Sequence, residues 1–408
     1  MARSKMPPKL FDAPGDCCGC GACAATCRRG AIAMIEDSRG FVFPRIDSSI
    51  CVGCGACEKA CGIRTHRGIE TSGPWYAACG MGDISDSASG GLFATFACQV
   101  IHEGGCAVGA AYVIDKKELC VNHRIAEDYD TLKLLLNSKY VQSNTETCFP
   151  DIKERLNRGQ EVFYCGTPCQ VAGLKGYLGR EWPNLVTADL VCHGVPSARL
   201  FHSYLEDLAE KYNSPVVDFR FRCKRNGWGH SLLLLRLEDG REIPIPSADS
   251  PYYDMFMNLK VQRDSCYSCQ YAGSFRAADI TLGDFWGIES SRPDLLKDGE
   301  LDVKRGISCL LINNNRGFEF MQHYGKKLVL KEVSLDDITR GNEQLRHPSK
   351  LSIDREIYLN AFEKRGWSGI SSVWYHRERG AWYSAKRLMR SLIGERGIKW
   401  YKKLFRAR

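Results

Sequence analysis

Residues 17–27 read CCGCGACAATC and residues 51–61 read CVGCGACEKAC, and these two stretches decide the architecture at the N-terminal end. Each contains four cysteines spaced C-x-x-C-x-x-C-x-x-x-C, and the second set lies 34 positions after the first. Three closely spaced thiolates can wrap one cubane [4Fe–4S] cluster, and the fourth cysteine of each run then binds the cluster of the other run. The duplication therefore predicts two [4Fe–4S] clusters that share ligands between the runs.

The predicted ligand sets follow from this exchange. One cluster is assigned to Cys17, Cys20, Cys23 and Cys61, and the other to Cys51, Cys54, Cys57 and Cys27. We accordingly expect a small two-cluster ferredoxin-type domain over residues 1–72. Two separate zinc sites are the alternative, although they do not explain the triple C-x-x-C-x-x-C runs. Cys18 is an additional thiol with either a structural role or a role as substitute ligand.

Composition narrows the class of protein. The chain has 408 residues, of which 44% are apolar and 25% charged, as in globular proteins. No uninterrupted apolar run reaches the ~18 residues of a membrane-spanning helix. The start of the sequence lacks the apolar core of a secretory signal, so we expect a cytoplasmic protein. Its 21 cysteines are then reduced, which favours metal binding over a disulfide framework.

Positive charge is concentrated at the C-terminal end. Residues 376–408 contain eleven Lys and Arg against two Glu, a net charge of +9, whereas the whole chain carries +8. The rest of the chain is therefore nearly neutral, which argues against a nucleic-acid-binding protein. We interpret residues 341–408 as a helical, basic tail. It is a candidate peripheral contact to the inner face of a membrane or to an acidic partner, with a solvated helix as the alternative.

Residues 73–340 predict a mixed α/β domain with a first part over 73–150 and a second over 151–340. Strands alternate with helices, which is typical of a largely parallel sheet. The predicted strands cover residues 106–114, 161–165 and 185–192, and the predicted helices residues 90–102, 151–157, 170–178 and 198–212. Ser89 and Ser197 are the predicted N-caps of the first and last of these helices.

Five further cysteines occur in turns rather than singly in apolar segments. Cys169 and Cys192 follow successive predicted parallel strands, whose carboxyl ends share one edge of a sheet, so their thiols are expected to face each other. Together with Cys266 and Cys269, spaced C-x-x-C, they predict a third [4Fe–4S] cluster. Cys165 is an alternative to Cys169, and a structural zinc ion is an alternative to the cluster.

An ordered series of motifs runs through the predicted α/β domain. The motifs are SGGLFA (89–94), SKYVQS (138–143), CGTPCQVAGLK (165–175), DLVCHGVPS (189–197), CYSCQYA (266–272) and ADITLGDFWG (278–287). With these motifs the sequence resembles the coenzyme F420 hydrogenase/dehydrogenase β-subunit family. The resemblance extends over about residues 75–330 and follows the predicted ferredoxin-type domain.

The resemblance implies a flavin, FAD in preference to FMN, close to a [4Fe–4S] cluster. Its implied contacts are Ser89, Gly90, Gly91, Lys139, Tyr140, Gln142, Ser143, Gly166, Thr167, Pro168 and Gln170. The Ser-Gly-Gly stretch precedes a predicted helix, whose free N–H groups suit a phosphate, although a plain N-cap is the alternative. Asp284 and Trp286 are expected in a packed turn nearby. His193, beside Cys192, is the candidate catalytic proton donor, with hydrogen bonding or turn packing as alternatives.

These cofactors predict a flavin- and iron–sulfur-dependent oxidoreductase. Electrons from a ferredoxin-like donor would pass through the clusters to FAD and on to a small organic substrate or the deazaflavin coenzyme, and the reverse direction is open. An electron-transfer subunit without its own substrate site is the alternative, and a zinc-stapled binding protein is the non-redox one. A strand–GxGxxG–helix unit is not evident, so direct use of a nicotinamide cofactor is not supported.

Overall fold

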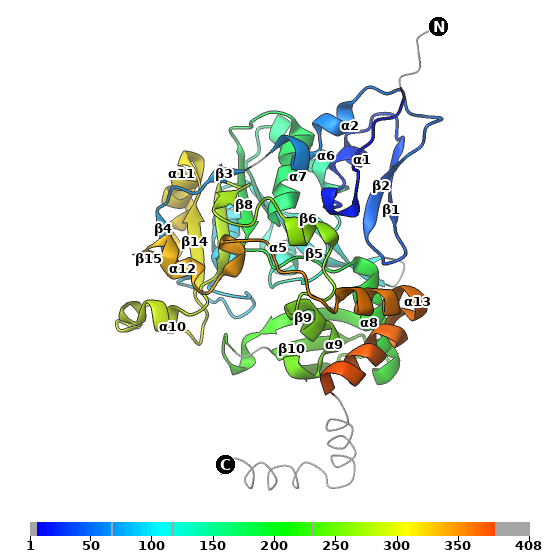
Figure 1. The fold of residues 1–408 in the computed structure, drawn as a ribbon. Coiled ribbons are helices and arrows are strands. Elements are labelled where there is room, and N and C mark those ends of the chain that lie inside the picture. Colours follow the sequence, from blue (N-terminus) through cyan, green and yellow to red (C-terminus); the bar gives the residue numbers. More distant parts are fainter. Residues whose placement is uncertain (1–5, 67, 116–117, 230–231, 380–408) are drawn as a thin grey trace, which may run out of the picture.

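The protein is built around one large mixed sheet, flanked by an N-terminal cysteine-rich unit and a smaller sheet (Figure 1). The computed structural model describes residues 6–66, 68–115, 118–229 and 232–379. The eight strands of the large sheet lie in the order β15 (Leu328–Val333), β4 (Trp75–Gly80), β14 (Ser308–Ile312), β13 (Ile280–Asp284), β8 (Leu185–Leu190), β7 (Val162–Gly166), β5 (Cys106–Asp115) and β6 (Glu118–Ala126).

The middle of this sheet is parallel and its margins are antiparallel. Strands β13, β8, β7 and β5 run in one direction, with Val162 of β7 opposite Leu185 of β8. Strands β14, β4, β15 and β6 pair with their neighbours antiparallel. The predicted parallel sheet is confirmed for these central strands. Their carboxyl ends therefore share one edge, at which turns from distant parts of the sequence meet.

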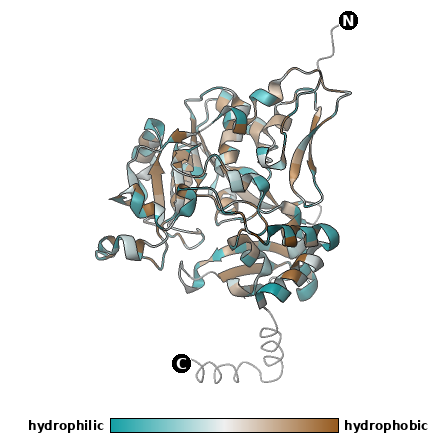
Figure 2. Ribbon diagram, viewed as in Figure 1, coloured by the Kyte–Doolittle hydropathy of each residue, from teal (hydrophilic) through white to brown (hydrophobic). Residues whose placement is uncertain are grey.

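Helices cover both faces of the large sheet because the side chains of its strands point alternately to opposite sides. One face packs against α4 (Leu92–His102), α5 (Tyr129–Leu135) and α11 (Asn315–Tyr324). The other packs against α6 (Cys148–Asn157) and α7 (Pro168–Leu178). The antiparallel margin adds α10 (Ile288–Ser291) and α12 (Leu335–Thr339). Figure 2 shows the corresponding pattern, with hydrophobic strands inside and hydrophilic helix surfaces outside.

A second core lies around the smaller sheet, whose strand order is β11 (Glu242–Pro246), β10 (Leu232–Leu237) and β9 (Val216–Cys223). It packs against α8 (Ala198–Tyr212), α9 (Pro251–Met257) and α13 (Arg355–Trp374). The β-rich region is thus separate from the parallel sheet. Helix α13 bends where Gly366 leaves the helical conformation, and its apolar side chains belong to the same core as those of α8.

The N-terminal unit has little regular structure. It contains the hairpin β1 (Ile32–Glu36) and β2 (Val42–Ile46) and the one-turn helices α1 (Ala22–Ala25), α2 (Ala56–Lys59) and α3 (Gly62–Thr65). After this unit, the two-residue strand β3 (Ile69–Glu70) pairs antiparallel with the two-residue strand β12 (Phe275–Arg276). The short 3₁₀ and π turns are η1 (Pro14–Asp16), η2 (Lys224–Asn226), η3 (Ser247–Asp249), η4 (Asp264–Ser268), η5 (Pro293–Leu296), η6 (Gly325–Lys327), η7 (Glu343–Leu345) and η8 (Tyr375–Arg379).

Two sequence predictions about helix ends have different outcomes. Ser197 caps α8, because its Oγ accepts the N–H of Leu200. The prediction that Ser89 caps α4 is wrong: the N-cap is Gly91, with a φ of 78°, and the Ser89 hydroxyl donates to the Ile307 carbonyl. Gly91 has this place because the left-handed conformation costs glycine little.

The predicted tail is described only in part. Its first part contains α13, which packs into the core around the smaller sheet, whereas residues 380–408, with most of the basic charge, lie outside the described residues. None of the helices in the described part of the chain is both long and apolar enough to span a membrane.

Candidate functional site

The two N-terminal cysteine runs fold into similar loops. Helices α1 and α2 each begin after a glycine with a φ of 74°, Gly21 and Gly55. Burial, with the neighbouring thiols of Cys17 and Cys61, raises the pKa of Cys23 to about 12. The structure therefore brings Cys61 from the second run beside two cysteines of the first run. This neighbourhood fits the exchange of ligands between the runs, which stays a prediction.

The remaining cysteines of the runs adjoin the first group, because Cys27 and Cys57 pack in the same small core as Cys23. Cys57 is buried and interacts with Cys54, which is exposed, while Cys27 packs in the same small core as Cys57. The Sγ atom of Cys27 accepts the N–H of Ala31 at 3.3 Å, and that of Cys51 accepts a backbone N–H at 3.5 Å.

A third group of cysteines gathers where three loops meet. Cys169 lies in the first turn of α7, Cys192 follows β8, Cys266 belongs to η4 and Cys269 follows it. Burial, and after it the thiol of Cys169, raises the pKa of Cys192 to about 12 and that of Cys269 to about 11. Cys266 interacts with all three. Four buried thiolates need a cation to offset their charge, so the group fits an iron–sulfur cluster.

Cys165 is not part of this third group. Side chains alternate along β7, so Phe163 and Cys165 pack toward α4, whereas Val162 and Tyr164 pack toward α6 and α7. Cys169 lies on the α7 side. Of the two candidate ligands that the sequence left open, the structure places Cys169 with the other three cysteines.

Cys18 lies between the first and third groups. It is 7% exposed, and its thiol hydrogen-bonds with the thiols of Cys169 and Cys20. Cys20 itself is packed against Gly173 of α7. Cys18 thus forms a sulfur contact between two predicted ligand sets. Within the described residues, no three His, Cys, Asp or Glu side chains are close enough to hold a single metal ion.

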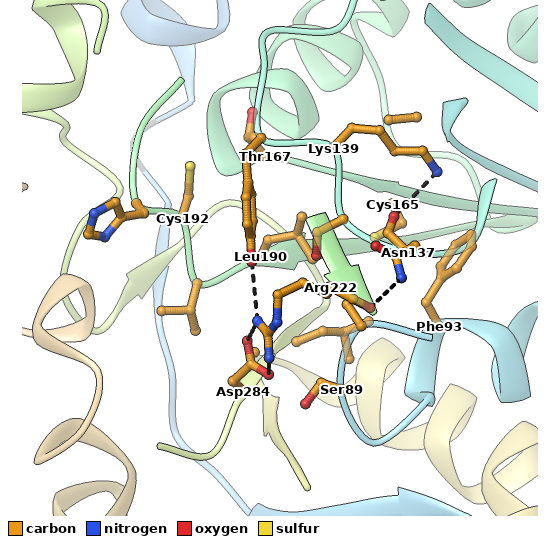
Figure 3. Close-up of a pocket in the computed structure, with 18 of the residues that line it drawn as sticks. Ser89, Phe93, Asn137, Lys139, Cys165, Thr167, Leu190, Cys192, Arg222 and Asp284 are labelled. Carbon is orange, nitrogen blue, oxygen red and sulfur yellow. Dashed lines mark hydrogen bonds and ion pairs between the residues drawn. The ribbon is translucent and has the colours of Figure 1, made fainter. Parts of the chain in front are cut away.

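A cavity of about 650 Å³ opens at the carboxyl ends of β7, β8 and β13 (Figure 3). It lies between the large sheet and the core of the smaller sheet, and its wall includes Cys192. The predicted site residues that line it are Ser89, Gly91, Lys139, Tyr140, Ser143, Gly166, Thr167, Gln170 and His193. The structure therefore gathers these segments around one cavity adjoining the third cysteine group.

The other predicted contacts do not line the cavity. The Gly90 N–H donates to the hydroxyl of Ser308, a residue of the cavity wall, and Pro168 is buried as the first residue of α7. The Gln142 amide donates to the carbonyls of Cys18 and Gly19. Gln142 therefore joins the cavity segment to the N-terminal unit rather than lining the cavity.

Lys139 lines the cavity with its stem but commits its ammonium group to the protein. The Nζ atom donates to the carbonyls of Leu134, Leu136 and Asn137 at 2.6–3.3 Å, which satisfies all three of its hydrogens. Burial lowers its pKa to about 7. The side chain thus caps the C-terminal end of α5, where carbonyl groups and the helix dipole attract a cation.

A buried polar chain fixes the turn after β7. The Gln170 amide donates to the Ser143 hydroxyl, which is 3.0 Å from His123 Nδ1. His123 Nε2 lies 3.1 Å from the carbonyl oxygen of Cys165, so it carries the ring proton and donates to that oxygen. Burial lowers the pKa of His123 to about 4, so the ring is neutral. Thr167 closes the turn through a capping box with Gln170.

An ion pair not predicted from the sequence forms part of the cavity wall. Arg222 of β9 donates to both carboxylate oxygens of Asp284, at 3.0 and 3.2 Å, and to the Tyr140 hydroxyl at 3.1 Å (Figure 3). The indole N–H of Trp228 donates to Asp284 at 2.7 Å, and its ring stacks on Trp286. The pair links the small sheet to the turn after β13.

His193 is half-buried at the cavity wall. Its Nε2 atom lies 3.1 Å from the Met257 carbonyl, and a carbonyl only accepts, so Nε2 carries the proton. Burial lowers the pKa of the ring, which favours the neutral form. In that state Nδ1 is an acceptor. The geometry therefore suits a proton acceptor better than the donor that the sequence suggested.

Comparison with known proteins identifies two parts of the chain. Residues 159–338 match the family described as the C terminus of the β subunit of coenzyme F420 hydrogenase/dehydrogenase. Residues 16–63 match the 4Fe-4S dicluster domain. The chain is thus an iron–sulfur electron-transfer protein related to the coenzyme F420 hydrogenase β subunit.

A solved structure also resembles it, that of the xenon-derivatised F420-reducing [NiFe] hydrogenase complex from Methanosarcina barkeri. The similarity covers 68% of this chain and 90% of that chain at 17% identity, with a TM-score of 0.44. A search of curated proteins finds no match.

The F420 hydrogenase β-subunit region contains residues that sequence reasoning did not single out. Arg222 lies in an alternating strand sequence, VVDFRFRC, in which nothing distinguishes it from a solvent-facing arginine. Asn137 lines the cavity with a φ of 67°, and its Oδ1 is a buried acceptor for which the described part of the chain provides no hydrogen-bond partner. The asparagine directly before SKYVQS could have indicated a left-handed backbone position at this point of the sequence, because asparagine tolerates a positive φ better than most residues do.

Proposed function

We propose that the protein is a flavin- and iron–sulfur-dependent oxidoreductase that transfers electrons between a ferredoxin-like partner and a small organic molecule. The position of Cys192 carries this proposal, since it lines the cavity and also belongs to the third cysteine group. A cluster held by that group would adjoin whatever the cavity binds. The match to the F420 hydrogenase β-subunit family supports the same reading.

The sulfur contacts define a route from the N-terminal unit to the cavity. Cys20 of the first predicted cluster and Cys169 of the third are both in contact with Cys18. The second predicted cluster includes the exposed Cys54, which makes its side of the molecule the proposed place for electron exchange with the partner. The route would then run from that surface through the first and third clusters to the cavity.

The cavity fits a flavin dinucleotide, FAD rather than FMN in our proposal. The N-terminus of the eleven-residue helix α4 lies at its wall, and the free N–H groups there suit a phosphate. Among the described residues, Asn137 Oδ1 has no hydrogen-bond partner, so it suits a ring N–H donor, and the charge of Arg222 at the wall is balanced by Asp284. When bound, a flavin exchanges single electrons with an iron–sulfur centre and electron pairs with an organic molecule.

The chain's own residues have defined tasks in this proposal. Gln170, Ser143 and His123 hold the turn after β7 rigid. Arg222 and Asp284 hold the opposite wall. We assign His193 to proton exchange with the substrate, through Nδ1, because the Met257 carbonyl fixes the proton of the neutral ring on Nε2.

Anaerobic purification of the full chain tests the proposal directly. We expect about twelve iron atoms per chain, four for each of three clusters, together with acid-labile sulfide and one flavin. A colourless protein with stoichiometric zinc would contradict both the clusters and the oxidoreductase function. About eight iron atoms per chain together with flavin would contradict the assignment of the third cluster.

A second candidate is an electron-transfer subunit that feeds a partner enzyme. The family description as a β subunit favours it. Purified protein supplied with an artificial electron donor separates the two candidates. Turnover of an organic acceptor, the deazaflavin coenzyme included, by the isolated chain supports our proposal. Flavin reduction without turnover of any acceptor supports the subunit.

A further inference from the structure

Arg263 is a fully buried cation that connects two of the predicted cluster sites. It lies directly before η4, and its side chain has no solvent exposure. Its Nε donates to the Cys17 carbonyl at 2.8 Å and one terminal nitrogen donates to the Val42 carbonyl at 2.7 Å. The other donates to the Gln142 amide oxygen at 3.2 Å. All three acceptors are neutral.

The absence of an acid distinguishes Arg263 from the other buried arginines. Arg276, Arg355 and Arg222 have carboxylate partners at 2.7–3.1 Å. In the ranges described by the structure, no Asp or Glu carboxylate lies within ion-pair distance of Arg263. A buried charge is costly unless an opposite charge compensates it. The site is therefore incomplete without an anion.

The neighbouring groups that can carry negative charge are thiols of two different predicted clusters. The Arg263 guanidinium binds the Cys17 backbone at 2.8 Å, and it is close enough to attract negative charge on the sulfur atoms of both Cys17 and Cys169. Cys17 belongs to the first predicted cluster and Cys169 to the third.

The backbone places Arg263 at the junction of the two ligand loops. Its carbonyl accepts the N–H of Cys266, a ligand of the third set, while its guanidinium binds the Cys17 carbonyl of the first set. The loop comes so close that a Cβ atom added to Gly19 would lie 2.9 Å from a terminal nitrogen of Arg263. Gly19 also has a φ of 68°, so the loop needs glycine for both reasons.

We propose that Arg263 is a buried counter-charge shared by the first N-terminal cluster and the third cluster, and that it raises the midpoint potentials of both. Reduction adds a negative charge to a cluster, so a fixed cation nearby stabilises the reduced form more than the oxidised form. Arg263 is thus a positioning and tuning residue that favours residence of the electron at the junction. The inference rests on the proposed cluster assignment.

The test is a redox titration, monitored by electron paramagnetic resonance, of the full chain purified anaerobically. The variants are Arg263→Met, which removes the charge, and Arg263→Lys, which keeps it. Arg28→Gln is the control, because Arg28 directly follows the predicted ligand Cys27 but is exposed, so that solvent screens its charge. Iron content is measured first on every sample.

We expect Arg263→Met to lower two of the three midpoint potentials by more than Arg28→Gln does, and Arg263→Lys to retain them near wild type. Potentials of Arg263→Met equal to those of Arg28→Gln, with all iron present, would overturn the inference. Wild-type protein without iron would instead refute the proposed function.

If Arg263→Met loses iron, its midpoint potentials cannot be compared, and the iron content of Arg263→Lys becomes the measurement that decides. If Arg263→Lys then keeps its iron, a cation is required and the inference stands. If Arg263→Lys loses as much iron, the site requires the hydrogen bonds of the guanidinium rather than its positive charge, and the proposed counter-charge role is refuted.

Discussion

Replacement of Gly62 by alanine tests the close contact between α3 of the N-terminal unit and α7. We call this contact the seam. A Cβ atom at residue 62 would lie 2.3 Å from the carbonyl carbon of Ala172 and 2.4 Å from its oxygen. Both are backbone atoms of a buried helix, so α3 has to move away by about 1 Å to restore normal contacts. Gly176 and Gly173 of α7 face Ala60 and Cys20 equally closely, so the seam cannot adapt by rotation.

The expected cost of this substitution follows from two opposing effects. Overpacking of a close-packed site costs roughly 1–3 kcal/mol, and contact with rigid backbone places Gly62→Ala at the upper end. Replacing glycine also restricts the unfolded chain, which returns about 0.4–1 kcal/mol. We therefore expect a net loss of about 2 kcal/mol in the free energy of unfolding.

Chemical denaturation under anaerobic conditions measures this loss. The control is Gly82→Ala, because a Cβ atom at residue 82 would meet nothing within 4 Å. The control is expected to stay within about 0.5 kcal/mol of wild type. Equal unfolding midpoints for Gly62→Ala and Gly82→Ala would show that α3 and α7 are not in close contact.

Three further predictions concern the clusters and the cavity. Cys192→Ser should reduce the iron content from about twelve to about eight atoms per chain, whereas Cys165→Ser should keep it, and equal loss in both variants would contradict the ligand assignment. His123 has a pKa of about 4 in the folded protein and about 6.5 when unfolded, so only the unfolded chain takes up the proton between these values. Stability should therefore fall by up to about 3 kcal/mol as the pH drops from 6.5 to 4, and His123→Gln should flatten this dependence in denaturation curves. Asp284→Asn leaves the Arg222 guanidinium in the cavity wall without its counter-charge. We expect the free energy of unfolding to fall by about 3 kcal/mol and the flavin-to-protein ratio to fall with it. An unchanged melting temperature would contradict a structural ion pair.

Local patterns in the sequence predicted local structure well. The cysteine spacing of residues 17–27 and 51–61 predicted ferredoxin-type loops, and the comparison identifies a 4Fe-4S dicluster domain there. The alternation of strands and helices predicted the central parallel strands and the cap at Ser197. These features depend on residues a few positions apart, so the sequence alone contains the information.

The side-chain directions around the cavity depended on the tertiary structure. Lys139 fits a phosphate by its charge, but packing turns its ammonium group toward the end of α5. The sequence predicts Ser89 as the cap of α4, but its hydroxyl donates instead to the carbonyl of Ile307, which lies 218 positions later in the chain. Residue type gives the chemistry available at a position, whereas the neighbours decide where it points.

The sequence by itself predicted iron–sulfur ligation by the N-terminal cysteines and an α/β body, of which residues 159–338 match the F420 hydrogenase β-subunit family. Only the tertiary structure decided that Cys169 rather than Cys165 joins the third group, because the two lie on opposite sides of the sheet. It also placed Arg263 against Cys17, 246 positions earlier in the chain. Ligand spacing is set within one loop, but a buried charge and its partners meet only when separate layers pack.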